Sequence, residues 1–404
     1  MTIDTVAATS PYISRAPGQR TGRTGASVLH VLRRLDQSGE ARLAIEFAAA
    51  LNDVGGQAAI VYDNGSVPPE LQRHAVPTIE IKLGSRAPFS GAAAAKRLAK
   101  LIGESTVDII HVHGLDLLPV VHAALGESAV KLVLGMNADP ARFAKLPKRL
   151  RQALERVDEI VVLSALTGRE LAATQPALAD RISLVEFGVD LTRFDPAQVS
   201  AHRVIQMAQQ WRVPDDRPVV MLPGRFARER GHSTLVEALG LIRDVDLRCI
   251  LVGPDADGPA FRKELSKELA QLGLGDRVFL TEECRDMPAA LMLADVVVAP
   301  YLAPGVHNRA IIEAMALGRP VVASDFPVAR ELLEHNDMAW LSPAGDSMAL
   351  SWAIREALAL PADHREILSQ RVIETLRDQR SRTRMCGAAL DIYERLRPTA
   401  AAAA

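Results

Sequence analysis

A single carboxylate, that of Glu313, lies in a short segment flanked on both sides by apolar runs. The runs at 294–300 and 321–324 predict strands covered on both faces, and a short helix that stops at Gly318 joins them. In such a unit the amino end of the helix faces the carboxyl edge of the sheet, where free N–H groups favour a phosphate. The two oxygens of Glu313 can accept hydrogen bonds from the hydroxyls of a ribose. An exposed glutamate on an ordinary helix is the alternative.

Two arginines follow the first predicted strand in the second half of the chain. The strand ends at Gly224 and Arg225, and Arg230 precedes the next predicted helix. Two guanidinium groups at this position can neutralise a diphosphate and stabilise the charge that grows on it as it leaves. The alternative is a solvated basic turn in which the arginines pair with Glu229 and Glu237.

The turn after the first predicted strand offers a second place for a phosphate. Ser38 and Gly39 open the helix predicted at 41–51, and a small residue there allows close approach of the backbone to an anion. An ordinary turn in which Ser38 caps the helix is an equally good interpretation.

Two histidines end another predicted strand. His111 and His113 alternate with Val112, so both histidine side chains lie on the same side of the strand. They are candidates for the acceptor or sugar side of a cleft. Packing or hydrogen bonding within the core is the commoner role of such histidines.

Short apolar runs alternate with longer helical patterns twice along the chain. This order predicts an α/β protein with two Rossmann-like parallel-sheet domains that face each other across a cleft. We place the domains at 27–197 and 198–381, with a linker around 195–213 and a final helix at 382–396 that crosses back to the first domain. The ends are 1–26 and a tail at 397–404, and we predict that 1–26 and 400–404 are mobile.

The composition sets bounds on function. The chain has 404 residues, 48% of them hydrophobic, and a formal net charge of −2, so we expect neither a nucleic-acid-binding nor a disordered protein. The sequence contains neither a signal peptide nor an apolar run of transmembrane length, which predicts a cytoplasmic protein. Three widely spaced cysteines match no metal-binding spacing and predict reduced thiols.

From residue 27 to 396 the chain resembles the GT-B fold nucleotide-sugar glycosyltransferases, most closely the retaining enzymes of family 4. The order and spacing of several short segments carry this resemblance. These segments are 38–40, 108–113, 160–164, 188–194, 224–225, 230–231, 251–253 and 313–324.

The resemblance implies transfer of a sugar, as in a hexosyltransferase, from a nucleoside diphosphate to an acceptor with retention at the anomeric carbon. It assigns the diphosphate to Arg225 and Arg230, although the family usually has a lysine at the second position, and this exchange changes the geometry of the cation. It assigns the ribose to Glu313. No metal or other cofactor is expected, and the expected partners are the nucleotide sugar and a glycan or lipid-linked acceptor.

The chain departs from the family pattern near the expected donor sugar. Gly305 stands where the family has its first glutamate, and His307 and Asn308 replace a Phe-Gly pair. Asn137 takes the place of a frequent histidine. We group Gly305, His307, Asn308 and the adjacent Arg309 with the donor-binding residues, and Asn137 with the sugar-side candidates. A surface turn is the alternative for His307 and Asn308.

These departures leave three interpretations open. The first is an active retaining enzyme of polysaccharide, lipopolysaccharide or glycolipid assembly, and the second is a catalytically silent nucleotide-sugar-binding or scaffold subunit. A nucleotide-sugar epimerase is a weaker third. The basic segment 145–151, with Arg142 nearby, is compatible with peripheral contact to anionic lipid at the inner face of a membrane, and a solvated helix face is the alternative.

Overall fold

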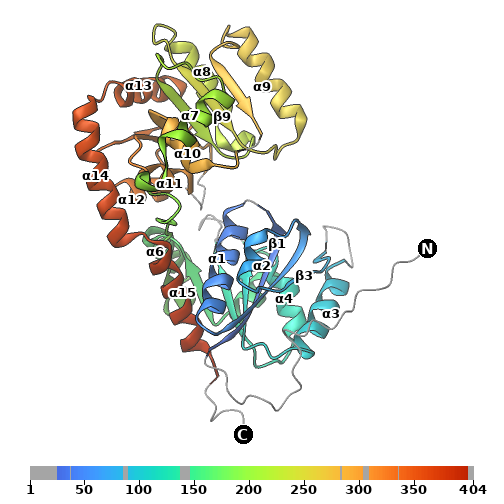
Figure 1. The fold of residues 1–404 in the computed structure, drawn as a ribbon. Coiled ribbons are helices and arrows are strands. Elements are labelled where there is room, and N and C mark those ends of the chain that lie inside the picture. Colours follow the sequence, from blue (N-terminus) through green and yellow to red (C-terminus); the bar gives the residue numbers. More distant parts are fainter. Residues whose placement is uncertain are drawn as a thin grey trace. The chain divides into compact units, whose positions relative to one another are not determined.

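The computed structural model describes residues 25–36, 38–84, 90–136, 146–282, 284–303, 309–334 and 336–398. They form two compact units, of which the second is Phe187–Arg384 and the first contains the residues before and after it. Each unit is an α/β domain with one parallel sheet between helices (Figure 1). The predicted fold class, two parallel-sheet domains in series, is confirmed.

The first unit contains a seven-stranded sheet in the order β3-β2-β1-β4-β5-β6-β7. Its strands are β1 (Ser27–Leu35), β2 (Gln57–Gly65), β3 (Thr78–Glu80), β4 (Ile109–His113), β5 (Lys131–Gly135), β6 (Glu159–Val162) and β7 (Ile182–Leu184). Its helices are α1 (Gly39–Asp53), α2 (Pro69–Arg73), α3 (Ser90–Gly103), α4 (Leu118–Leu125), α5 (Lys148–Glu155), α6 (Ala165–Thr174) and the short η2 (Pro176–Arg181).

The second unit contains a six-stranded sheet in the order β10-β9-β8-β11-β12-β13. Its strands are β8 (Val219–Pro223), β9 (Arg248–Val252), β10 (Val278–Thr281), β11 (Val296–Ala299), β12 (Val321–Ser324) and β13 (Ala339–Ser342). Its helices are η3 (Pro196–Gln198), α7 (Ala201–Gln210), η4 (Arg228–Arg230), α8 (His232–Leu241), α9 (Pro259–Gln271), α10 (Met287–Leu293), α11 (Arg309–Ala316), α12 (Pro327–Leu333), α13 (Ser347–Leu358) and α14 (Ala362–Gln379).

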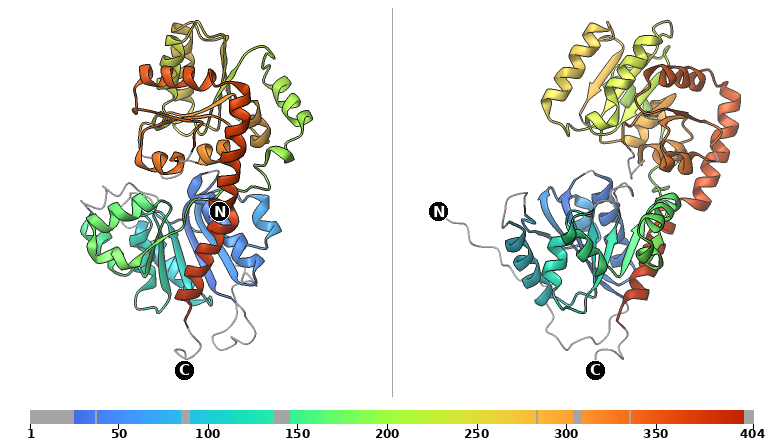
Figure 2. Two further views of the ribbon diagram at one scale, coloured as in Figure 1. Left: turned by 90° about the vertical axis from the view of Figure 1, so that its left-hand side faces the viewer. Right: turned by 180° about the vertical axis from the view of Figure 1, so that it is seen from behind.

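The last helix, α15 (Arg382–Leu396), begins in the second unit and belongs to the first from Met385 onward. Figure 2 shows its carboxyl-terminal part lying along the first unit. Tyr393 and Cys386 are buried there: the Tyr393 hydroxyl meets His111, and the Cys386 thiol lies 3.7 Å from the carbonyl oxygen of Glu46. The predicted bounds and destination of this helix agree with the structure.

The chain passes between the units after Glu186, earlier than the boundary predicted after residue 197. The reason lies in contacts that tie the following residues to the second unit. Val189 pairs with Ser381 as in a parallel sheet, and the amide of Val189 donates to the carbonyl of Arg380 at 2.8 Å. The segment predicted as a linker, 195–213, contains α7, whose Arg203 binds Asp286. It is therefore part of the second domain.

Each unit buries its own hydrophobic core. The predicted apolar stripe of α1, formed by Leu43, Phe47 and Leu51, is buried against the first sheet, and the strands at 296–299 and 321–324 are buried along their whole length. Apolar runs of this kind are what a parallel sheet covered on both faces requires. The predicted ends, 1–26 and 397–404, lie outside the described residues except for 25–26 and 397–398.

Candidate functional site

The turn after β8 is held against the turn after β9 by two glycines. Gly224 has φ +146° and Gly253 has φ +156°, and a Cβ on Gly253 would lie 2.0 Å from the carbonyl oxygen of Gly224. The amide of Gly224 donates to the carbonyl of Val252 at 2.8 Å. Only glycine permits this backbone contact, so Arg225 leaves the sheet edge in a fixed direction.

Phe226 anchors the same turn. Its ring is fully buried between the guanidinium of Arg262, 4.0 Å from the ring centroid, and the imidazole of His232, 4.9 Å away and nearly parallel. Arg262 is fixed in turn by Asp255, at 2.9 Å. The loops after β8 and β9 therefore pack around one aromatic ring, and the residues on either side of Phe226 are well positioned.

The two predicted arginines have different surroundings. The Arg225 side chain is 38% exposed and lies 3.8 Å from Glu229, an exposed ion pair that contributes little stability. Arg230 instead lies over the ring of Tyr301, 4.6 Å from its centroid. Within the described residues neither arginine pairs with Glu237. Arg225 is thus paired only weakly with Glu229, as one alternative predicted, and both guanidinium groups are available to an anion.

Residues 229–231, after β8, lie opposite residues 300–302, after β11, and the two segments run antiparallel. The amide of Leu302 donates to the carbonyl of Glu229 at 2.8 Å. At the other end Gly231, with φ +70°, lies so close to Pro300 that a Cβ would be 1.8 Å from the Pro300 carbonyl oxygen. The Arg230 side chain meets Tyr301 between these two contacts. Because β8 and β11 are neighbours in the sheet, these contacts join their carboxyl ends.

Glu313 lies on α11, the helix that follows the loop after β11. Its side chain is buried, with 8% of the residue exposed, so the alternative of an exposed glutamate is wrong. Arg309, one turn earlier, donates to a Glu313 oxygen at 2.5 Å. A carboxylate accepts about four hydrogen bonds, so this contact leaves capacity for a ligand. Arg309 therefore balances the charge of Glu313.

The second unit thus holds Gly224, Arg225, Arg230, Arg309 and Glu313 on segments that follow two adjacent strands, β8 and β11. The remaining donor-side and sugar-side candidates Asn137, Gly305, His307 and Asn308 lie outside the described residues.

Ser38 and Gly39, in the first unit, form the amino end of α1. The Ser38 hydroxyl accepts from the amide of Ala41 at 3.4 Å, so Ser38 is the N-cap of α1, as the alternative interpretation predicted. Gly39 is the first helical residue and is not among the described glycines with positive φ. The conformations of Ser38 and Gly39 are those of an ordinary helix start. Their role in donor binding stays a prediction.

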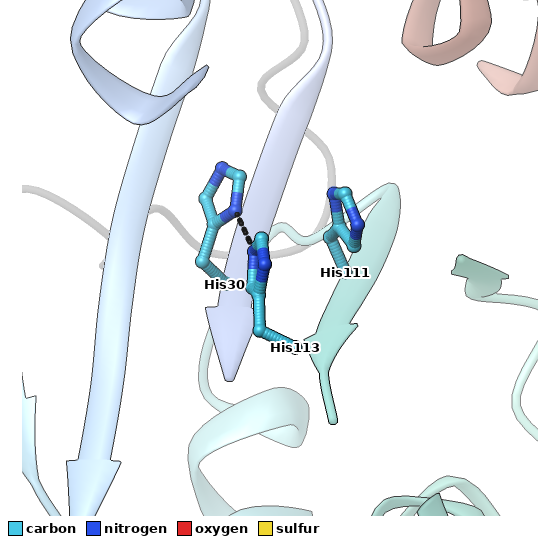
Figure 3. Close-up of side chains that lie close together, drawn as sticks. All are labelled: His30, His111 and His113. Carbon is cyan, nitrogen blue, oxygen red and sulfur yellow. Dashed lines mark hydrogen bonds between the residues drawn. The ribbon is translucent and has the colours of Figure 1, made fainter. Parts of the chain in front are cut away.

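His111 and His113 lie in the core of the first unit with a third histidine, His30, from the neighbouring strand β1 (Figure 3). Nδ1 of His30 and Nε2 of His113 are 3.0 Å apart and share a hydrogen bond, and Nδ1 of His111 shares one with the Tyr393 hydroxyl at 2.6 Å. All three histidines are buried. They face α1 and α15, where Phe47 stacks on His111.

Ligand atoms of these histidines lie within 4.8 Å of one another, close enough to test as a metal site. The rings of His111 and His113 stack at 4.2 Å with an angle of 22°, and His30 lies at 25° to His113. Lone pairs lie in the ring planes, so nearly parallel rings do not aim them at one point. One nitrogen each of His30 and His113 is also already hydrogen-bonded. The cluster fits neutral, packed imidazoles better than a set of metal ligands.

Burial keeps the imidazoles of His30 and His111 neutral. It lowers the pKa of His30 from 6.5 to about 3, and burial together with the nearby His30 lowers the pKa of His111 well below its ordinary value. In the unfolded chain His30 binds a proton more readily than in the folded chain. The stability that the neutral His30 contributes to the fold is therefore complete above pH 6.5 and is lost as the pH falls toward 3. We expect the first unit to lose about 2 kcal/mol through His30 alone between about pH 7 and pH 5.

Urea unfolding at the two pH values measures this loss. His30→Asn retains a hydrogen-bonding group without a titrating ring and should remove about 2 kcal/mol of the acid sensitivity, whereas His202→Gln, on an exposed position of α7, should leave it unchanged. Equal acid sensitivity in His30→Asn and the wild type would contradict the assignment.

Gly231 provides a test of the contact between the loops after β8 and β11. Gly231→Ala adds a Cβ at positive φ against the Pro300 carbonyl, and we expect it to destabilise the second unit by about 2 to 4 kcal/mol. The matched control is Gly240→Ala in α8, where the Cβ would lie 3.7 Å from Leu272, an ordinary contact. This change should stabilise the helix by about 0.5 to 1 kcal/mol. Similar unfolding free energies for the two variants would contradict the close approach.

Five residues around these sites were not predicted from the sequence: Tyr301, Phe226, Arg262, His30 and Tyr393. Tyr301 had a signal, since it closely follows a buried strand at the edge where ligands bind. The others act through contacts between distant segments, and their spacing in the sequence does not reveal these contacts.

Two family profiles match the chain. The profile described as Glycosyltransferase Family 4 matches residues 38–193, almost all of them in the first unit, and the one described as Glycosyl transferases group 1 matches residues 217–359, in the second. The chain belongs to glycosyltransferase family 4. Its two parallel-sheet domains are those of the GT-B fold. Among the described residues, none of the helices combines the length and the apolar character that a membrane span needs.

Curated relatives are similar to about half of this chain. A D-inositol 3-phosphate glycosyltransferase from Mycolicibacterium gilvum is 30% identical over 253 residues, which are 57% of this chain and 53% of the relative. An alpha-D-kanosaminyltransferase from Streptomyces kanamyceticus is 27% identical over 52% of this chain and 54% of the relative. The chain thus spans about half the length of the curated relatives it matches.

Solved structures match over nearly the whole family 4 chain. A glycosyltransferase from Rickettsia africae has a TM-score of 0.81 and 23% identity, covering 92% of this chain and 98% of that one. Alr3699/HepE from Anabaena, in complex with UDP and glucose, has a TM-score of 0.80 and 20% identity, covering 91% and 99%. At these identities the matches establish the fold.

Proposed function

We propose that this family 4 glycosyltransferase moves a sugar from a nucleoside diphosphate donor to a hydroxyl of a glycan or lipid-linked acceptor, with retention at the anomeric carbon. The observation that carries the proposal is the position of Arg225 and Arg230 in the loop after β8, which contacts residues 300–302 after the neighbouring strand β11. The buried Glu313 lies on α11, the next helix along the chain. The complex of Alr3699/HepE with UDP and glucose supports a uridine donor as the first to test.

Each residue has a role in this proposal. Arg225 and Arg230 bind the diphosphate and stabilise the charge that develops when its bond to the anomeric carbon breaks. Glu313 accepts hydrogen bonds from the ribose hydroxyls. The acceptor oxygen forms the new bond on the face from which the diphosphate leaves, and its proton passes to the departing diphosphate. The reaction then needs no carboxylate at the position of Gly305.

A panel of uridine and guanosine diphosphate sugars, incubated with the purified protein and glycan or lipid-linked acceptors, tests the proposal. We expect release of one nucleoside diphosphate and a product whose anomeric configuration, read by proton NMR, equals that of the donor. Nucleotide binding without turnover of any donor would favour the silent subunit. The absence of both at millimolar nucleotide would contradict the proposal, and an inverted product would contradict retention.

We also propose peripheral contact of the first unit with anionic membranes. Three basic side chains of α5, Lys148, Arg149 and Arg151, are exposed, while Ala153 and Leu154 on the same helix are buried in the core. Arg142 and Lys145 lie outside the described residues. In co-sedimentation with vesicles that contain phosphatidylserine, we expect binding at low salt that a triple replacement of the three exposed residues by glutamine abolishes. Equal sedimentation of both proteins would contradict the contact.

A further inference from the structure

Tyr301 is a residue to which neither the motifs nor the proposed reaction assigns a role, yet it contacts one of the two diphosphate-binding candidates. It follows β11, is 4% exposed, and lies beneath the guanidinium of Arg230, which is 4.6 Å from the ring centroid. The ring is therefore shielded from water and has a cation over one face. A stacked guanidinium is attracted to the face of an aromatic ring, most strongly where water is excluded.

The backbone fixes this contact from both sides. Glu229 and Leu302 share a hydrogen bond on one side, and Gly231 meets Pro300 on the other. Residue 230 must therefore face residue 301. The paired loops bring the two residues opposite each other, and the Arg230 side chain then lies over the ring.

The contact gives the arginine at position 230 a property that a lysine would lack. A guanidinium is planar and carries its N–H donors in one plane, which suits two parallel hydrogen bonds to a phosphate. A ring beneath the guanidinium limits the directions in which this plane can turn. An ammonium group is a point charge on a flexible stem and gains no comparable orientation.

We propose that Tyr301 is a positioning residue that holds the Arg230 guanidinium in the orientation that binds the donor diphosphate. This proposal rests on the proposed function, and it deepens it by explaining why an arginine serves at position 230. A ring that merely fills space beneath the loop is the competing explanation. The two explanations differ in whether positions 230 and 301 depend on each other.

A double-mutant cycle measures that dependence. Arg230→Lys, Tyr301→Leu and the double variant are compared with the wild type by calorimetric titration with UDP and GDP and by kcat/KM for sugar transfer. We expect Tyr301→Leu to weaken nucleotide binding about three- to tenfold and Tyr301→Phe to preserve it. Arg230→Lys should cost about tenfold in the wild type but less than about twofold in the Tyr301→Leu background, because the stack is already lost there.

The matched control is Arg225→Lys, since Arg225 lies on the same loop and contacts Glu229 instead of the ring. Its cost should be the same with tyrosine or leucine at position 301. Should Tyr301→Leu fail to fold, Tyr301→Met retains a large apolar side chain and enters the same cycle. Thermal unfolding of each variant shows whether a loss of binding reflects a loss of structure.

The outcomes separate the proposal from the function on which it rests. Equal costs of Arg230→Lys in both backgrounds would overturn the positioning role and leave the proposed function standing. The coupling energy between Tyr301 and Arg225 could also equal that between Tyr301 and Arg230. That result would favour a space-filling role and would likewise overturn the positioning role. A wild type that neither binds UDP or GDP nor transfers a sugar would overturn both.

Discussion

Replacement of Arg225 by alanine is expected to lower kcat/KM for sugar transfer by about two to three orders of magnitude, mainly through kcat. Arg225 leaves the sheet edge beside Gly224, and its partner in the described part of the chain is Glu229, in an exposed ion pair at 3.8 Å. Its charge is therefore available to the diphosphate as negative charge accumulates there. Loss of a group that acts chiefly in the transition state lowers kcat and kcat/KM together.

The same replacement should leave the fold intact. Arg225 is half-exposed and contributes no side chain to the core, so the free energy of unfolding should change by less than about 0.5 kcal/mol. Arg228→Ala is the matched control from the same turn: Arg228 pairs with Glu264 and lies over Phe261 at 4.9 Å. We expect less than about a threefold change in its activity. Equal losses in the two variants would show that general disruption of the turn, and not the charge of Arg225, is responsible.

Glu313→Gln is expected to raise the KM for the donor about ten- to a hundredfold, with a smaller change in kcat. The amide keeps the volume of the buried side chain but loses the charge that strengthens hydrogen bonds to the ribose hydroxyls. Because the ribose is bound alike in the ground state and the transition state, its loss appears mainly in KM. Arg309, 2.5 Å from Glu313, also loses a charged partner, so the thermal stability should fall slightly.

Steady-state kinetics with varied donor concentration measure the changes in KM and kcat separately. Glu356→Gln, on an exposed position of α13, is the control and should leave KM unchanged. A variant Glu313→Gln with unchanged KM and reduced kcat would contradict the ribose assignment and point to a role in the chemical step.

The fold could be predicted from the sequence because its signals are local. Buried strands such as 296–299 and 321–324 are continuous apolar runs, and a parallel sheet is the arrangement that covers them on both faces. The boundary after Glu186 could not be predicted, because the pairing of Val189 with Ser381 joins residues far apart in the sequence. The helix propensity of residues 195–213 predicts a helix there, but it does not show to which unit that helix belongs.

The surroundings of the candidate site residues could be predicted only where a residue follows a recognisable strand. Arg225 and Glu313 satisfy that condition, since they follow β8 and β11, which are neighbours in the sheet. The stack of Arg230 on Tyr301 and the burial of Phe226 depend on which loops meet, and the sequence carries no local signal for that. The histidine cluster shows the same limit, since His30 joins His111 and His113 only because β1 is the neighbour of β4.

Hydrogen–deuterium exchange of the protein with and without saturating UDP-sugar tests most directly the claim that the nucleotide sugar binds at the carboxyl ends of β8 and β11. Peptides that cover residues 224–231 and 309–316 should exchange more slowly with the ligand, and Arg225→Ala should weaken this protection at the same ligand concentration. Protection confined to peptides of the first unit, with residues 224–231 and 309–316 unchanged, would contradict the account.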